Sequence, residues 1–461
     1  MSEDKRFGLT PKEKASLLVR LSQQRAAAKT EPARPAPAIE PMADLVDPEL
    51  RREMDMIRSA GQLLSVSDPF FRVHEGIAGA ETRIGNRWLV NFSSYNYVGL
   101  NGDPRVSDAA KAAIDRYGTS ASASRIVSGE RPVQRDLEKA LAEIHGTEDC
   151  VALVSGHATN VTVIGHLFGP KDLILHDALI HNSVVQGAIL SGARRVSFPH
   201  NDFEAASRIL GEQRAGHRHA VIIIEGHYSM DGDVPDLPGF VAVAQKHRAR
   251  IMVDEAHALG VVGPRGYGLA EHFGIDPAAV DIWMGTLSKA LAGCGGYIAG
   301  SKALVEYLKF TAPGFVYSVG MSPPVAAASL ASLEILRAEP ERVQRLNTNA
   351  KRFLDRAKAK GLDVGASAGL AIVPIITGSS IVAGRLAEAM YRRDINVQPI
   401  LYPAVPERSS RLRFFLSSAH TNEQIDNTID ALAEESAAIS ATKVDLPSLM
   451  KKLGANGTKP V

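Results

Sequence analysis

Short apolar runs alternate with amphipathic segments through the middle of the chain, from about residue 105 to residue 300. Apolar residues recur at helical spacing over 105–117 and 131–145. Runs too short for helices predict strands at 150–154, 172–176, 194–197, 220–225, 250–254, 281–285 and 296–299. Strands that are apolar on both faces are typical of a parallel sheet covered by helices. The pattern therefore predicts an α/β large domain over residues 105–338, with a mainly parallel seven-stranded sheet.

The pattern changes after a long alanine-rich helix that is predicted over 323–338. Helices are predicted over 342–360, 381–392 and 421–439, with strands over 371–376, near Val397 and over 413–416. This mixture predicts a smaller α+β domain over 339–440, followed by a tail over 441–461. Before the large domain, a segment over 46–104 carries a helical pattern at 50–64 and two short strands within 83–92 around the turn Gly85-Asn86.

Residues 1–45 differ in composition from the rest of the chain. Helical spacing over 11–25 places Leu18, Val19 and Leu21 among basic residues, and a Pro/Ala-rich stretch that predicts a flexible linker follows. One interpretation is a disordered tail with a nascent helix. The other is a docking helix, similar to the short Leu/Arg helices that flank carrier domains in polyketide and peptide synthases.

Charge and cysteine content exclude several classes of protein. The net charge is +1, so nothing favours binding to nucleic acid or to a membrane surface. Cys150 and Cys294 form no CxxC pair, which indicates reduced thiols in the cytoplasm, not disulfides or a zinc site. No apolar run approaches the length of a membrane span, and the charged N-terminus is not a secretory signal.

Lys289 is the strongest candidate for chemistry. It follows a predicted strand, in the sequence Thr286-Leu-Ser-Lys289, and Gly293, Gly295 and Gly296 come directly after it. A lysine held at a strand end and partly desolvated has the lowered pKa that Schiff-base chemistry needs. Alone, the tetrapeptide equally describes a solvated lysine in a turn.

Asp254 ends another apolar strand, and His257 lies three residues after it. A carboxylate at such a position needs a cationic or N–H partner. A protonated pyridine nitrogen is such a partner, and protonation makes the ring an electron sink. Asp-x-x-His could also be half a metal site, but no third ligand clusters with it in the sequence, and we predict no metal.

Further polar groups follow the other strands. Ser155-Gly156-His157 opens a predicted helix, and its free N–H groups suit a phosphate, although an ordinary capped helix start has the same pattern. His176 and His181 lie near a strand end, where an imidazole could stack on a flat ring or serve only the structure. The glycines and acids of 225–233 also suit a plain turn.

Arg411 and Arg413 alternate along a predicted strand of the small domain and so share one face. An arginine held there can bind a carboxylate through two parallel hydrogen bonds. A surface ion pair explains the same pattern.

Taken together, these segments resemble the α-oxoamine synthases, a branch of the fold-type I pyridoxal-phosphate (PLP) enzymes. The family includes serine palmitoyltransferase, 8-amino-7-oxononanoate synthase, 5-aminolevulinate synthase and glycine C-acetyltransferase. The resemblance rests on seven ordered segments, which are 91–100, 118–129, 155–160, 225–233, 254–257, 286–289 and 411–413. It implies a fold-type I PLP-dependent transferase and a homodimer with active sites at the interface.

The resemblance also implies a role for each matching residue. Lys289 would carry PLP as a Schiff base, Asp254 would pair with the pyridinium nitrogen, and His181 would stack on the ring. The other cofactor-binding residues would be Ser155, Gly156, His157, Ser229, His257, Thr286 and Ser288, of which Gly156, His157, Thr286 and Ser288 would hold the phosphate. The substrate-binding residues would be Asn96, Ser124 and Arg413. Lys289, His181 and Asp254 would be the catalytic set.

The implied reaction is a decarboxylative Claisen condensation. Serine, alanine or glycine would react with an acyl thioester, carried by coenzyme A or by an acyl carrier protein, to give an α-amino ketone, CO₂ and a free thiol. Lys289 would remove the α-proton, and His181 would help to polarise the thioester carbonyl.

Three departures bear on which member the chain resembles. Tyr95 stands where many members have Asn, Val319 stands where a hydroxyl often reaches the partner's phosphate, and 118–125 is rich in Ser and Ala. These features are similar to serine palmitoyltransferases and to synthase-associated members. The alternatives are an 8-amino-7-oxononanoate synthase of biotin synthesis, an aminotransferase on the same fold, or a cofactor-free docking scaffold, against which the intact Lys289 and Asp254 argue.

Overall fold

The computed structural model describes residues 66–441 continuously and a few isolated positions between residues 16 and 55. The predicted helices over 11–25 and 50–64 and the predicted tail after residue 440 lie outside the continuous range. Internal contacts divide the chain into residues 1–59 and 60–461, and the second unit is described by itself below. Among the described residues, no helix is both long enough and apolar enough to cross a bilayer.

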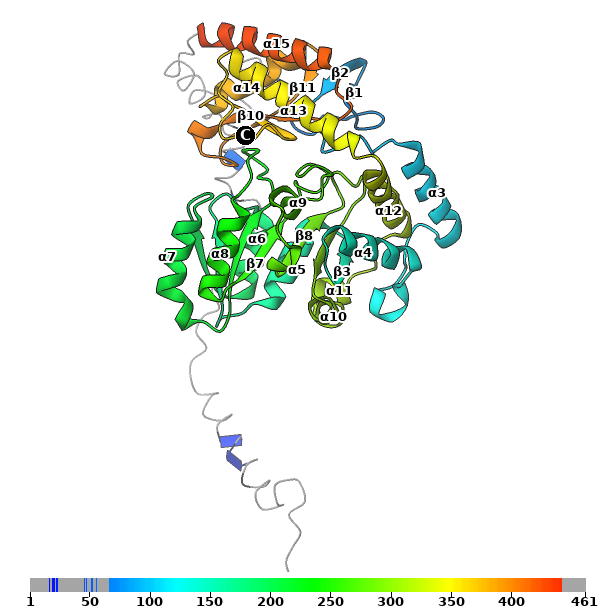
Figure 1. Ribbon diagram of the computed structural model, residues 1–461, viewed down its shortest axis with the longest axis vertical. Helices are drawn as coiled ribbons and strands as arrows, with labels where there is room; N and C mark the ends of the chain where they lie inside the picture. Colours follow the sequence, from blue (N-terminus) through cyan, green and yellow to red (C-terminus); the bar gives the residue numbers. More distant parts are fainter. Residues whose placement is uncertain are drawn as a thin grey trace, which may run out of the picture. The chain divides into compact units, whose positions relative to one another are not determined.

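A seven-stranded sheet forms the centre of the large domain (Figure 1). Its strands are β3 (Asp149–Leu153), β4 (Leu173–Asp177), β5 (Arg194–Phe198), β6 (Ala220–Glu225), β7 (Arg250–Asp254), β8 (Ile282–Thr286) and β9 (Gly296–Gly300). They lie in the order β3-β9-β8-β7-β6-β4-β5. Only β9 runs antiparallel to its neighbours, because it returns directly from β8 through the turn that contains Lys289. The predicted mainly parallel sheet of seven strands is confirmed.

Alternation along the strands gives the sheet two apolar faces. In β6, Ile222 and Ile224 belong to one core and Val221 and Ile223 to the other. The helices around the sheet are α3 (Pro104–Tyr117), α4 (Pro132–Ile144), α5 (Gly156–Leu167), α6 (Asn182–Ser191), α7 (Phe203–Gln213), α8 (Leu237–His247), α9 (Leu269–Phe273), α10 (Lys302–Thr311), α11 (Pro313–Val316) and α12 (Pro323–Ala338). Helices α4, α7 and α8 contribute to the first core, and α5, α6 and α10 to the second. Because both faces are covered, polar groups can gather only where strands end.

The small domain contains the predicted helices and two short sheets. Its elements are α13 (Glu341–Ala359), β10 (Ile372–Ile376), α14 (Ser380–Arg392), β11 (Ile395–Asn396), β12 (Gln398–Ile400), β13 (Arg411–Phe415) and α15 (Asn422–Ala441). One sheet has the order β10-β13-β12; in the other, β11 joins the hairpin of β1 (Glu81–Ile84) and β2 (Arg87–Asn91). The chain before the large domain therefore pairs with the small domain. The exact domain boundaries stay a prediction.

Candidate active site

Polar side chains line a cavity of about 200 Å³ at the carboxyl ends of β6, β7 and β8. Glu225 ends β6 and lies in register with Asp254, which ends β7. The predicted residues that line the cavity are Ser155, Gly156, His157, His181, Asp254, His257, Thr286, Ser288 and Lys289. Residues from five separate parts of the sequence meet there because parallel strands end at one edge of the sheet.

Lys289 is held by a closed turn between β8 and β9. The Leu287 N–H donates to the Gly295 carbonyl at 3.0 Å, and the Gly293 N–H donates to the Leu287 carbonyl at 2.8 Å. Burial lowers the pKa of Lys289 to about 8, although the charges of Asp254 and Glu225 oppose that shift. An amine with this pKa is partly unprotonated near neutrality and can act as a nucleophile or a base.

A chain of hydrogen bonds leads from Asp254 to His181. Asn160 Nδ2 donates to Asp254 Oδ2 at 2.8 Å and lies 2.9 Å from Ser183 Oγ. Ser183 Oγ lies 2.7 Å from His181 Nδ1, and the Ser183 N–H donates to the same nitrogen at 3.2 Å. The other oxygen of Asp254 accepts from the Ala256 N–H at 3.0 Å. These contacts fix the carboxylate and the imidazole relative to each other.

The same contacts indicate the tautomer of His181. A backbone N–H can only donate, so Nδ1 is the unprotonated nitrogen and the ring proton sits on Nε2. Burial lowers the pKa of His181, which favours this neutral form. His181 can therefore donate a hydrogen bond from Nε2.

His257 packs against two tyrosine side chains, Tyr97 and Tyr95. Its Nδ1 is 2.8 Å from the buried Tyr97 hydroxyl, and the Tyr95 ring meets the imidazole edge to face at 5.8 Å. Burial keeps the pKa of His257 well below its usual value, so the ring is neutral. The Lys289 Nζ lies 5.7 Å from the centre of the Tyr95 ring. Tyr95 thus borders the lysine on the side away from the strands.

The start of α5 is shaped for close approach of an anion. Ser155 caps the helix by accepting from the Ala158 N–H at 3.3 Å, and the N–H groups of the first turn have no helical acceptor. A Cβ on Gly156 would lie 2.8 Å from Thr286 Oγ1, so only glycine fits there. Ser288 Oγ is 3.2 Å from Thr286 Oγ1. Both hydroxyls can rotate toward an anion.

Glu225 is a buried carboxyl with an incomplete set of partners. Its Oε2 accepts from the Ser229 N–H at 3.2 Å, while its Oε1 is buried without a partner in the structure. Burial and the neighbouring charge of Asp254 raise the pKa of Glu225 to about 8. At neutral pH the Glu225 carboxyl is therefore mainly protonated and uncharged.

The two arginines of β13 differ in their partners. Arg411 pairs with Asp231 at 2.7 Å. Arg413 is half-buried, donates to the Ser229 carbonyl at 3.0 Å and has a buried Nε without a partner. Its charge lowers the pKa of Lys289, so it lies within electrostatic reach of the amine. Ser229 itself lies beside the cavity and does not line it.

A second cavity, of about 510 Å³, lies on the other side of Lys289 and is lined mainly by hydroxyl and amide groups. The predicted substrate residue Asn96 lines it. However, Asn96 Nδ2 donates to the Ala78 and Asn101 carbonyls, each at 3.0 Å, and Oδ1 accepts from the Asn101 N–H at 3.0 Å. Its amide thus fixes the surrounding loop.

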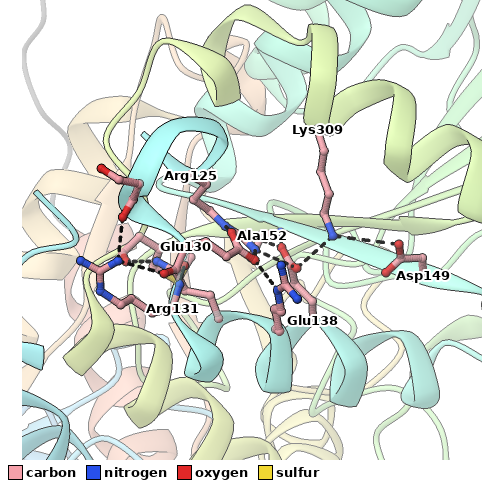
Figure 2. Close-up of polar contacts among 11 residues, drawn as sticks. Arg125, Glu130, Arg131, Glu138, Asp149, Ala152 and Lys309 are labelled. Carbon is pink, nitrogen blue, oxygen red and sulfur yellow. Dashed lines mark hydrogen bonds and ion pairs between the residues drawn. The ribbon is translucent and has the colours of Figure 1, made fainter. Parts of the chain in front are cut away.

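Ser124 is not brought to either cavity. It precedes the short π-helix η1 (Arg125–Gly129), which the Arg125 side chain anchors between Glu130 and Glu138 (Figure 2). Lys309 donates to Glu138 Oε2 at 3.1 Å from the opposite side. The predicted substrate role of Ser124 stays a prediction for this reason.

Sequence reasoning missed four residues of the site. Asn160 lies within the matching segment 155–160 and Ser183 lies two residues after His181, but only the packing of α5 against α6 reveals that they connect Asp254 to His181. Glu225 was interpreted as part of a turn, and Tyr95 was noted only as a departure from the family. The available signal was that two apolar strands, β6 and β7, each end in an acid, Glu225 and Asp254.

Comparison with protein families supplies the classification. The model for aminotransferase class I and II matches residues 87–432. The chain belongs to this family. 8-Amino-7-oxononanoate synthase of Fervidobacterium nodosum is 38% identical over 384 residues, which cover 83% of this chain and 95% of the relative.

Solved structures add two serine palmitoyltransferases. The enzyme of Sphingomonas wittichii has a TM-score of 0.82 at 30% identity and covers 87% of this chain and 100% of its own. A serine palmitoyltransferase with PLP has a TM-score of 0.81 at 29% identity, with the same coverage. The chain is thus an α-oxoamine synthase, a PLP-dependent acyltransferase with the fold-type I architecture.

The residues of the cavity fit PLP. Asp254 supplies a fixed carboxylate for the ring nitrogen, Gly156 lets the start of α5 pack directly against Thr286 at the cavity, and Lys289 supplies an amine of lowered pKa. Among residues 66–441, no group of three or more His, Cys, Asp or Glu side chains could hold a metal ion.

Proposed function

We propose that this protein condenses a small amino acid with an acyl thioester, with loss of CO₂, to give an α-amino ketone and a free thiol. The observation that carries the proposal is the position of Lys289 between two cavities, one suited to PLP and one polar and larger. PLP, when bound, supplies an electron sink for a carbanion beside an amino group. The chain supplies placement and electrostatics.

Each part of the site has a role in this proposal. Asp254 would hold the ring nitrogen, the start of α5 with Thr286 and Ser288 would hold the phosphate, and His257 and Ser229 would contribute to binding the phenolic oxygen. The Lys289 amine, with its pKa of about 8, would move the α-proton. His181 would stack on the ring, and its Nε2–H would donate to the thioester carbonyl as negative charge develops there.

Arg413 is the proposed partner of the amino-acid carboxylate. It is the arginine of β13 without a carboxylate partner, and its charge reaches Lys289. A half-buried guanidinium with a buried, unpartnered Nε favours bidentate binding of an incoming carboxylate. Asn96 would contribute only if its three loop contacts opened.

We infer a homodimer in which the loop over 118–129 faces a second copy. Val127 and Tyr317 are 80% and 86% exposed, and Ile126 and Val319 are also exposed apolar residues. Gly320 N–H donates to the Ala123 carbonyl at 3.0 Å, so the two exposed segments are joined. This arrangement supports an interface that brings Ser124 toward the partner's site. A cytoplasmic location likewise stays a prediction, supported by two free cysteines.

A second candidate is formation of 8-amino-7-oxononanoate itself, which the identity to the Fervidobacterium nodosum enzyme favours. That product has a methyl carbon beside the amine-bearing carbon, so the amino donor would be alanine. Its terminal carboxylate would come from a dicarboxylic acyl thioester. The structural likeness to serine palmitoyltransferase favours serine with a long acyl chain.

The test incubates the PLP-loaded protein with serine, alanine or glycine and then adds acyl thioesters on coenzyme A or on a carrier protein. We expect one amino acid to change the absorbance of the bound cofactor and to give thiol and CO₂ in equal amounts. Formation of a 2-oxo acid without thiol release would instead identify an aminotransferase. Comparing a fatty-acyl with a dicarboxylic donor separates the two condensation candidates.

A further inference from the structure

The loop between β6 and α8, over residues 226–233, connects the two domains beside the active site. On the side of the small domain, Arg411 donates to the Met230 carbonyl at 2.9 Å, and Arg413 donates to the Ser229 carbonyl at 3.0 Å. The Ala368 N–H donates to the Gly232 carbonyl at 2.9 Å. The position of Arg413 therefore depends on where this loop lies.

At Gly232 the loop packs closely against the small domain. Its φ is +71°, and a Cβ built there would lie 2.1 Å from the Ile372 carbonyl oxygen of β10. Such contact leaves no space for the loop to shift without moving the strand. A displacement of the loop is thus passed directly to β10 and, through the β10–β13 pairing, to Arg413.

His200 fixes this loop to the large domain from the opposite side. It lies just after β5, and its Nδ1 is 2.9 Å from Asp177 Oδ1, at the end of β4. Its Nε2 is 2.9 Å from Asp233 Oδ2, at the end of the loop. The imidazole therefore bridges two carboxylates that belong to different segments.

The other groups around His200 complete the attachment. Asn201 Nδ2 donates to Asp233 Oδ2 at 2.6 Å, and the Asn201 N–H donates to Asp177 Oδ2 at 2.8 Å. The Tyr228 ring meets the imidazole edge to face at 4.5 Å. Two hydrogen bonds to carboxylates, from both ring nitrogens, require a doubly protonated ring. The two carboxylates raise the pKa of His200 to about 10, so the imidazolium persists at neutral pH.

We propose that His200 is a positioning residue that sets Arg413 by holding the loop over 226–233 between two carboxylates. It touches neither cavity: its effect passes from Asp233 through the loop to the Arg413 guanidinium. This deepens the proposed function, on which it rests for its kinetic consequence. Loss of the bridge weakens binding of the amino-acid carboxylate and leaves the PLP cradle of α5, β7 and β8 intact.

The kinetic test uses His200→Gln, with His247→Gln as the matched control. His247 is a histidine of the large domain whose ring, among residues 66–441, bonds only to the Ser207 hydroxyl, at 2.9 Å. We expect His200→Gln to raise the KM for the amino acid about 10-fold, the low end for a charge-assisted contact. The kcat and the affinity for PLP should change less than about 2-fold, within the usual scatter of surface changes. If the KM for the amino acid rises no more in His200→Gln than in His247→Gln, the proposal is wrong.

A double-mutant cycle with Arg413→Lys tests the route. If His200 acts through Arg413, adding His200→Gln to Arg413→Lys raises the KM little beyond the single Arg413→Lys change. Fully additive losses contradict this route. If His200→Gln does not fold, Asp233→Asn removes one of the two carboxylates with less change in shape, and the same KM effect and the same non-additivity are expected from it.

Hydrogen–deuterium exchange over residues 226–233 gives a readout that needs no substrate. The Tyr228 and Gly232 N–H groups bond within the loop, at 3.0 Å to Asp233 O and 2.9 Å to Tyr228 O. We expect these amides to exchange about 10-fold faster in His200→Gln, and not in His247→Gln, because the loop loses its attachment. If these amides exchange at the wild-type rate in His200→Gln, the proposal for His200 is wrong, whichever reaction the enzyme catalyses. Faster exchange without any amino-acid turnover in the wild type would instead contradict only the proposed function.

Discussion

Two clusters of charged side chains differ in how completely their charges are paired. The Arg125 cluster consists of Arg125, Glu130, Glu138, Asp149 and Lys309 (Figure 2). Arg125 donates to both glutamates, and Glu138 also accepts from the Ala152 N–H at 2.8 Å. Every charge in this cluster has an opposite charge beside it.

The cavity around Lys289 contrasts with that cluster. Among the described residues, Glu225 Oε1 and Arg413 Nε are buried without partners. Leaving buried polar groups unpaired costs stability, so such groups persist where a ligand completes them. The comparison teaches that a cluster in which every charge is paired stabilises the fold, whereas a cluster with unpaired buried groups can bind a ligand.

The largest effect is expected from Lys289→Ala. Without the amine, the α-proton has no acceptor at that position, so turnover should fall at least about 10⁴-fold, the upper range for positioned proton transfer. The absorbance of protein-linked PLP should also disappear. Lys246→Ala, on the surface helix α8, serves as the control and should behave as the wild type. Turnover of Lys289→Ala near the wild-type rate would refute the central role of this amine.

Arg125→Met breaks the saturated cluster. It leaves Glu130 and Glu138 without their main cation, and we expect the free energy of unfolding to fall by about 3–5 kcal/mol, as for other broken buried ion pairs. Denaturant titration measures the loss. Arg135→Met removes the 73% exposed partner of Glu130 and should cost less than about 1 kcal/mol. Equal losses in the two variants would show that the cluster does not anchor η1.

Glu225→Gln should change the pH dependence of stability. The pKa of Glu225 is raised to about 8 in the folded protein, so the folded state binds more protons than the unfolded state between pH 4.5 and 8. Its contribution to stability is full below pH 4.5 and is lost as the pH rises through 8. The PLP-free variant, which cannot titrate there, should lose less stability than the wild type over this range, by up to about 1.4 kcal/mol per pH unit.

Unfolding midpoints of the PLP-free protein at pH 5, 6.5 and 8 measure this difference. Glu334→Gln, a solvent-exposed position on α12, is the matched control and should follow the wild type. Parallel curves for Glu225→Gln and the wild type would mean that Glu225 is ionised throughout, with the cavity more hydrated than its burial implies.

Much of the fold could be predicted because its signals are local. The strand that ends in Asp254 and the alanine-rich helix α12 are both found over the predicted residues, since uninterrupted apolar runs and helical spacing are read from adjacent positions. The gathering of Lys289, Asp254 and His181 followed from the rule that parallel strands end at one edge of the sheet.

What could not be predicted depends on orientation and on long-range packing. Tyr95 and Asn96 both line the second cavity, but Tyr95 lies beside Lys289, whereas the Asn96 amide bonds to Ala78 and Asn101. Loop conformation decides this difference, and it cannot be read from adjacent positions in the sequence. The bridge made by His200 joins residues 177, 200 and 233, which no periodicity connects. Ser124 lines neither cavity, and no local pattern in the sequence indicates this.

Lys289 lines two cavities that differ in size. This has a practical consequence for chemical labelling. The first cavity is the smaller of the two, so we expect a bulky amine-selective reagent to reach this side chain from the larger, hydroxyl-rich cavity. Reagents graded in bulk would thus measure from which direction the amine is accessible.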